Sequence, residues 1–224
     1  GNTTPNDLGA ALINSTQMTV ITDATFTSVQ ISLGGKNILN TGKTLAITGA
    51  LTIAGELEMA DSSVVDAGGD VTVSGTLDMD GTSKMKMEGD LSFSGTMEAS
   101  TTSRIDLDGG SAQTISGAAT PVFNSLFCSS SATVFNLTAT ISDTLDTGGE
   151  DFTISSGKTL TMDANSVTVI SGGAWTRTGT LALDADSKVL YTTGANSTMT
   201  PEVYGHIEHN GGTLSQDGAL TIAG

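Results

Sequence analysis

A repeat of 20 residues is the feature that most restricts the fold of this chain. Three segments align without a gap: GALTIAGELEMADSSVVDAG from Gly49, GDVTVSGTLDMDGTSKMKME from Gly69 and GDLSFSGTMEASTTSRIDLD from Gly89. Each segment begins with a glycine and carries a second one six residues later. A fixed period of this length marks an architecture in which successive units stack on one another.

Within each repeat, apolar residues alternate with polar ones in three short runs. In the first repeat these runs hold Leu51 and Ile53, Leu57 and Met59, and Val65 and Ala67. Alternation with a period of two is typical of strands with one buried face, and the Gly, Asp and Ser between the runs favour corners. One unit cannot bury its apolar face alone, but stacked units align equivalent residues into ladders. The sequence therefore predicts an all-β fold, a β-solenoid of about 20-residue, three-strand coils.

The repeat also divides the chain. Regular coils are expected over 49–108 and looser coils over 109–224, within a solenoid over 25–224. In the looser part we expect Leu160 to stack under Leu181 and Val167 under Val189. Residues 1–24 are predicted to form an N-terminal cap, with a short helix over NDLGAALINS, or else an extended docking arm. Roughly eleven coils at about 4.8 Å each would form a rod of about 50 Å.

Composition excludes several classes of partner. The formal net charge is −16, with only 8 Lys and Arg in 224 residues, so no nucleic acid is expected as a partner. An anionic membrane surface is disfavoured for the same reason. No apolar run is long enough for membrane insertion, and the N-terminus lacks the pattern of a signal peptide. The single cysteine cannot form an internal disulfide.

Several segments resemble a known family. QTISGAATPVFNSLFCSSSATV and the strands TLTM, TLALD and ALTIAG are similar to coils of secreted bacterial and archaeal β-solenoid surface proteins. This adhesin-like group has filamentous-haemagglutinin or right-handed β-helix architecture. The resemblance covers the chain from about Thr25 onward. It implies the solenoid fold and an extracellular or cell-surface location, while the same coils serve adhesins, stalks, surface layers and filaments.

Stacked acidic residues are the candidate metal ligands. Glu58, Asp78 and Glu98 recur every 20 residues, each directly after an inward apolar position. They should form an outward column of like charges about 4.8 Å apart. Calcium suits such hard oxygen ligands, although the Gly-Gly-x-Gly-x-Asp calcium repeat is absent. The alternative is a solvated acidic face, and no other cofactor is expected. Lys84, Lys86 and Arg104 in neighbouring coils are expected to offset part of the charge.

Residues typical of enzymes do not form a recognisable set. His206 and His209 are three apart, so on a strand they point to opposite faces. Cys128 has no histidine or basic neighbour in sequence and is expected in the core. Trp175, beside Arg177, is a candidate for carbohydrate stacking, but its position in the repeat favours burial. We therefore expect no enzymatic activity and no catalytic residue.

Two further sets of residues follow from sequence. N-x-[ST] sequons, the acceptors of N-glycosylation, begin at Asn2, Asn14, Asn136 and Asn196. GALTIAG at 218–224 repeats GALTIAG at 49–55, which suggests an open coil. Either the chain is a fragment of a longer tandem protein, or another copy completes this coil by strand addition. The residues expected at the joint are Gly218, Leu220 and Ile222 at one end and Met18, Val20, Val29 and Ile31 at the other.

These observations favour a structural extracellular protein that assembles with copies of itself, head to tail, into a filament or an elongated surface element. An adhesin stalk or head that binds glycan or a host surface is the alternative. A polysaccharide lyase of β-helix fold is a third, and it requires a cleft between long loops and paired carboxylates.

Overall fold

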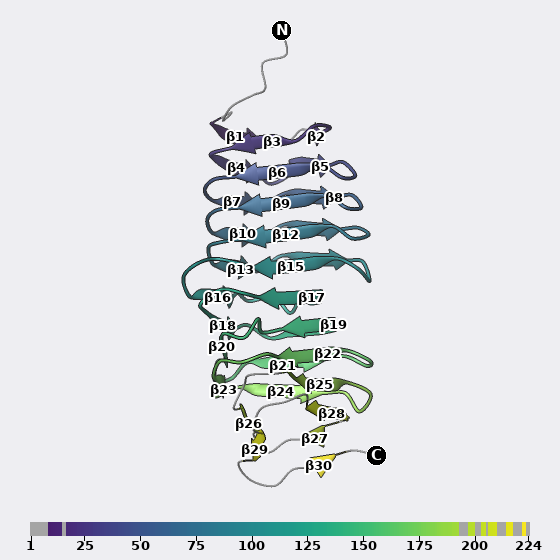
Figure 1. Cartoon of the computed structure of the whole chain (residues 1–224). Coiled ribbons are helices and arrows are strands. Elements are labelled where there is room, and N and C mark those ends of the chain that lie inside the picture. The colour runs from purple at the N-terminus through teal and green to yellow at the C-terminus, as the bar shows by residue number, and fades with distance from the viewer. Residues whose placement is uncertain are drawn as a thin grey trace.

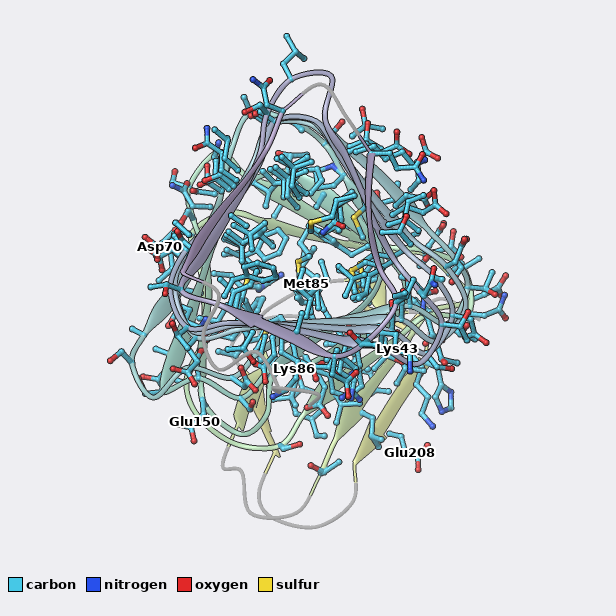
Figure 2. The ribbon with its side chains drawn as sticks, turned by 90° about the horizontal axis from the view of Figure 1, so that it is seen from above. Lys43, Asp70, Met85, Lys86, Glu150 and Glu208 are labelled. Atoms are coloured by element: carbon cyan, nitrogen blue, oxygen red, sulfur yellow. The ribbon has the colours of Figure 1, made fainter. Side chains whose placement is uncertain are left out.

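The computed structural model describes residues 9–14 and 17–192, and beyond them the strands β26 (Ser197–Met199), β27 (Val203–Tyr204), β28 (His206–His209), β29 (Leu214–Gln216) and β30 (Thr221–Ile222). The chain forms a β-solenoid of about 9 turns, with no helix among the described residues. Figure 1 shows the coils stacked along one axis. Viewed along that axis, the coils enclose a roughly triangular section (Figure 2).

Three parallel sheets form the sides of the solenoid. Sheet A has nine strands: β1 (Ala10–Ile13), β4 (Ser28–Ile31), β7 (Leu51–Ile53), β10 (Val71–Val73), β13 (Leu91–Phe93), β16 (Gln113–Ser116), β18 (Ala132–Asn136), β20 (Asp151–Ile154) and β23 (Trp175–Arg177). Sheet B has five: β2 (Gln17–Val20), β5 (Lys36–Leu39), β8 (Glu56–Met59), β11 (Thr76–Met79) and β14 (Thr96–Ala99).

Sheet C is the longest sheet. It contains β3 (Ala24–Phe26), β6 (Thr44–Ile47), β9 (Val64–Ala67), β12 (Lys84–Met87), β15 (Arg104–Leu107), β17 (Val122–Cys128), β19 (Ala139–Asp146), β22 (Val167–Ile170), β25 (Lys188–Tyr191) and β28. Strand β21 (Thr159–Met162) pairs with the first half of β19, and β24 (Thr180–Leu183) pairs with β21. Two small pairs, β26 with β29 and β27 with β30, lie toward the C-terminus.

The predicted ladders are confirmed by the strand register. Leu51 pairs with Val71, which pairs with Leu91, and the corresponding inward residues of sheets B and C pair in the same way. Except for Met97 and Ala99 on β14, these side chains are buried in one continuous core. In Figure 2, Met85 points into the triangle and Lys86 points away from it, as alternation requires. Leu160 also stacks on Leu181, as predicted.

The N-terminal part of the stack differs from the expectation. Residues 10–13 form the strand β1 instead of a helix, and β1 pairs in register with β4. The coils therefore begin before Thr25. The turn count is also lower than roughly eleven, because some of the chain lies outside the described coils. Beyond the regular coils the spacing of paired residues varies, from 18 between Val122 and Thr140 to 24 between Leu91 and Ile115.

The predicted stacking of Val167 on Val189 is wrong, because the register is shifted by one residue. Val167 pairs with Lys188, and Thr168 pairs with Val189. Thr168 is buried and Val167 faces outward. The reason is that Ser166 takes the inward corner position that Ser63, Ser83 and Ser103 occupy in the regular coils, where all four side chains are buried. Because side chains alternate, a shift of one residue reverses the faces of the whole strand.

Tight turns close four corners between sheets B and C and the equivalent corners between β21 and β22 and between β24 and β25. In each, the fourth residue donates its backbone N–H to the carbonyl oxygen of the first: Lys43 to Asn40, Ser63 to Ala60, Ser83 to Asp80, Ser103 to Ser100, Ser166 to Asp163 and Ser187 to Asp184. Strands β17 and β19, seven and eight residues long, run through this corner without such a turn. Figure 1 shows turns projecting beside β8, β11 and β22 but none beside β17 and β19.

Glycines allow close approach at the corner between sheets A and B. A Cβ atom on Gly75 would overlap the carbonyl oxygen of Gly55, and one on Gly95 would overlap that of Gly75. Both neighbours are backbone atoms held in the ladder, so they cannot move aside cheaply.

We therefore expect Gly75→Ala to lower the free energy of unfolding by about 1–3 kcal/mol, as overpacking does in cores. Gly110→Ala is the control, since nothing lies within 4 Å of a Cβ at that position. Denaturant unfolding followed by circular dichroism measures both variants. Equal stability of the two would contradict the packing argument.

At two irregular positions of the stack, buried polar side chains have hydrogen-bond partners. Gln113 donates to the carbonyl oxygens of Met87 (2.9 Å) and Gly89 (2.6 Å) and accepts from the N–H of Gly109. Asn124 donates to the carbonyl oxygen of Ser103 at 3.0 Å. Asn37 differs: it is 0% exposed, and neither of its amide atoms has a hydrogen-bond partner in the structure as described.

Asn37 stands in the ladder between Met18 and Leu57. An unpaired buried amide costs about 1–3 kcal/mol, so Asn37→Leu is expected to raise the free energy of unfolding by a similar amount. Leu57→Asn, one coil further along, is the reciprocal variant and is expected to lower it. If Asn37→Leu destabilises the chain in denaturant unfolding, the ladder argument fails at this position.

Candidate functional site

The outer face of sheet B carries the acidic column that the repeat predicts. Glu58 pairs in register with Asp78, and Asp78 pairs with Glu98. Glu58 and Asp78 are half-buried, whereas Glu98 is exposed. Like charges directly across adjacent strands destabilise a sheet, so this face needs either screening or a cation.

Lys36 supplies a cation at one end of this column. Its Nζ lies 2.6 Å from Oε1 of Glu56 and 2.7 Å from Oε2 of Glu58. These hydrogen bonds raise the pKa of Lys36 well above its ordinary value. The sequence analysis missed both Lys36 and Glu56, although the signal was present. Lys36 lies one period before Glu56, so extending the 20-residue register by one coil would have found the pair.

The acidic cluster fits the lysine better than it fits calcium. Ligand atoms of Glu56, Glu58 and Asp78 lie within 4.8 Å of one another, and Glu98 is not part of this group. Calcium takes 6–8 oxygen ligands, whereas two of these three carboxylates already bind the Lys36 ammonium. Calcium binding by Glu58, Asp78 and Glu98 therefore stays a prediction.

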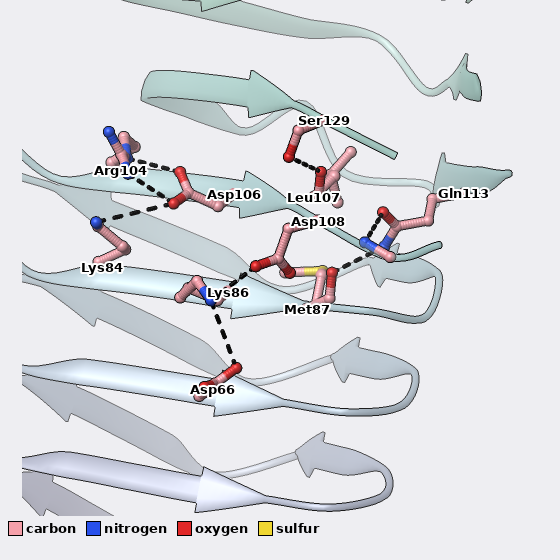
Figure 3. A network of polar contacts seen from close by, with 11 residues as sticks. Asp66, Lys84, Lys86, Met87, Arg104, Asp106, Leu107, Asp108, Gln113 and Ser129 are labelled. Atoms are coloured by element: carbon pink, nitrogen blue, oxygen red, sulfur yellow. Dashed lines mark hydrogen bonds and ion pairs between the residues drawn. The ribbon is translucent and has the colours of Figure 1, made fainter. Parts of the chain in front are cut away.

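A second polar network covers the outer face of sheet C (Figure 3). Nζ of Lys86 lies 2.7 Å from Asp108 and 3.9 Å from Asp66, and the Asp108 hydrogen bond raises the pKa of Lys86. Arg104 binds Asp106 at 2.6 Å. Lys84 and Lys86 thus pair with aspartates of neighbouring coils on the sheet C side, whereas Arg104 pairs within its own strand, and the cations do not face the column on sheet B.

The residues considered for catalysis lie apart. Cys128 is buried, and burial raises the pKa of its thiol to about 12. His206 is exposed on β28, opposite Lys188, while the side chain of His209 lies outside the described residues. Trp175 is half-buried and stacks on Phe152 with ring centroids 5.0 Å apart. This contact places Trp175 against the core, as its position in the repeat predicted.

Two of the four sequons can be placed. Asn14 and Asn136 are exposed. Asn2 and Asn196 lie outside the described residues, so their accessibility stays a prediction.

The residues expected at a self-assembly joint occupy different positions. Met18 and Val20 face inward on β2, the first strand of sheet B. Val29 and Ile31 lie on β4, which is paired with β1 on one edge and with β7 on the other. Gly218 and Leu220 fall outside the described residues, and Ile222 lies on β30, opposite Tyr204.

Strands β1, β2 and β3 therefore form the first coil of the described stack. Each has one described partner, β4, β5 and β6 respectively. The sequence analysis missed β1 as part of this edge, because its short apolar run AALI fits a cap as well as a strand.

Comparison of the chain with protein-family models, curated proteins and solved structures finds no match. No helix long and apolar enough to cross a membrane occurs among the described residues.

Asp78 gives this face a testable pH dependence. Desolvation, followed by the charges of Asp80, Glu98, Glu58 and Glu56, raises its pKa. A carboxyl group with a raised pKa in the fold costs stability when ionised, and this cost disappears as the pH falls through that pKa.

We expect Asp78→Asn to raise the free energy of unfolding by about 0.2–1 kcal/mol at neutral pH, the size of a cross-strand pair. The difference should vanish in acid that protonates Asp78. Glu150→Gln, an exposed change at another corner, is the control and should be neutral. A loss of stability in Asp78→Asn at neutral pH would overturn the reading of this column as repulsive.

Proposed function

We propose that this protein is a structural element of an extracellular surface or filament, a rod that associates with copies of itself end to end. The observation that carries the proposal is the first coil, in which β1, β2 and β3 each have a described partner on one edge only. A bare edge of a parallel stack is a template for another strand. A further coil placed there would continue both the backbone pairing and the apolar ladders.

The regularity of the stack supports a structural role. Turns with one hydrogen-bonding pattern close six equivalent corners of the coils, and the core passes without interruption from Ile13 to Leu181. A lyase would require long loops around a cleft with paired carboxylates. Acidic residues such as Glu58, Asp66 and Asp78 instead lie on outer sheet faces, where lysines pair with several of them.

Charge favours growth along the axis over lateral association. The net charge of −16 makes the sides of two rods repel. The end of a coil instead offers backbone N–H and C=O groups, which need no complementary charge. The extracellular location rests on the resemblance of the coils to secreted β-solenoid surface proteins.

End-on association predicts particles whose length grows with concentration while their width stays constant. Negative-stain electron microscopy and sedimentation velocity over a concentration series, with and without a calcium chelator, measure this. Single short rods at every concentration would contradict the proposal. Fibres that dissolve in chelator would make a metal part of the joint.

Leu12→Pro is the variant that tests strand addition at the edge of β1. The carbonyl oxygen of Ile13 accepts the N–H of Ser32 in the next coil, so by alternation the N–H of Leu12 points away from β4, toward the other edge of β1. Proline there removes one edge donor without breaking the pairing with β4. We expect it to reduce association at least about tenfold, equivalent to about 1.4 kcal/mol. Leu12→Ala keeps the N–H and removes an exposed side chain, so it separates strand addition from apolar contact.

A further inference from the structure

Met18 is an inward methionine that the core does not fully cover. It lies on β2 in the first coil of the described stack (Figure 1), and it is half-buried although it packs against the core. Inward methionines deeper in the stack are 0% exposed: Met59, Met79, Met85, Met87 and Met162. Strand β2 has one described partner, β5. The end of the rod at which we propose association therefore leaves this thioether side chain accessible.

The residue next to Met18 in the ladder is a buried amide without a partner. Met18 pairs in register with Asn37, so the two side chains leave neighbouring strands about 4.8 Å apart on the same inward face. Asn37 is 0% exposed, and its Nδ2 group has no hydrogen-bond partner. Leu57, on the other side of Asn37, offers no acceptor. A thioether sulfur is only a weak acceptor, so Met18 in its reduced form does not compensate this donor.

Oxidation of Met18 supplies the missing acceptor. A hydroperoxide transfers one oxygen atom to the sulfur: the S–O bond forms and the O–O bond breaks. The sulfur loses two electrons, and the peroxide is reduced to water or an alcohol with no net uptake or release of protons. The sulfoxide oxygen is polar and accepts hydrogen bonds, so it can take one from Nδ2 of Asn37. The buried amide thereby gains a partner, and the end layer of the core becomes polar.

We infer that Met18 is a site of reversible oxidation by hydroperoxides and that its sulfoxide, held by Asn37, switches off association at this end of the rod. The switch rests on the proposed end-to-end association. The other inward residues of the first coil, among them Ala11, Val20 and Phe26, are apolar. Another coil stacked on this layer removes water from the sulfoxide, which costs free energy and opposes association. Methionine sulfoxide reductases restore the thioether.

The first measurement is the oxidation rate of each methionine in the full chain, treated with hydrogen peroxide and analysed by peptide mass spectrometry. At low protein concentration, Met18 is expected to oxidise at least about tenfold faster than the buried Met59 and Met79, because oxidation follows exposure. At concentrations that favour association, Met18 is expected to slow. Met97, half-buried at the opposite end of sheet B, is the control and should keep its rate. Equal rates for Met18 and Met59 would overturn the inference.

The second measurement is association, followed by sedimentation velocity over a concentration series. Met97→Leu and Met199→Leu form the background, since Met97 is half-buried and the side chain of Met199 lies outside the described residues. Peroxide is expected to weaken association of this chain at least about tenfold, equivalent to about 1.4 kcal/mol, and sulfoxide reductases to restore it. Met18→Leu keeps an apolar side chain without sulfur and is expected to abolish the response to peroxide. The same response with and without Met18 overturns the switch.

The third measurement does not need association. In the same background, Asn37→Leu is expected to raise the midpoint of denaturant unfolding before peroxide treatment and to lower it afterwards, because the sulfoxide then lacks its donor. A rise of equal size in both states overturns the role of Asn37. If untreated chains do not associate at any concentration, the proposed function fails and the switch fails with it. The oxidation rates and the reversal at Asn37 still decide whether Met18 is the oxidation site.

Discussion

Parallel pairing between successive coils is the interaction on which the rest of this structure depends. Each strand gains backbone partners above and below, and each inward side chain gains a like neighbour in the next coil, as Leu51 does with Val71. With 4% aromatic residues, the core is built mainly from aliphatic ladders stacked at a fixed register. The same constraint explains why glycine is needed where one corner lies directly over another, as at Gly55 and Gly75.

The repeat predicts the fold well where it is regular and poorly where it is interrupted. From Gly49 to Asp108, spacing alone identified the inward residues of the strands, and the register confirms each pair, but the buried corner residues Ser63, Ser83 and Ser103 were missed. At Val167 the period of 21 to 22 residues left the register open by one position, and the buried corner Ser166 decided it. Strand β1 was missed because AALI matches no repeat. Lys36 was missed because its carboxylate partners are set by neighbours across strands.

Because the backbone groups of each coil pair with those of the neighbouring coils, we expect function where this pairing stops. In sheets A, B and C of the described chain, the strands with one described partner are β1, β2 and β3 in the first coil and β14, β23, β24 and β28 at the far ends of the sheets. The edge of the first coil suits a further coil of like geometry.

The central claim is that coils associate through strand edges at the end of the stack. Hydrogen–deuterium exchange of the full chain at low and high protein concentration tests it most directly. The account predicts that protection rises with concentration at edge amides of the first coil, including that of Leu12, while the outer faces of sheets B and C stay unchanged. Protection that does not depend on concentration, or that rises along the sides of the rod, would contradict it.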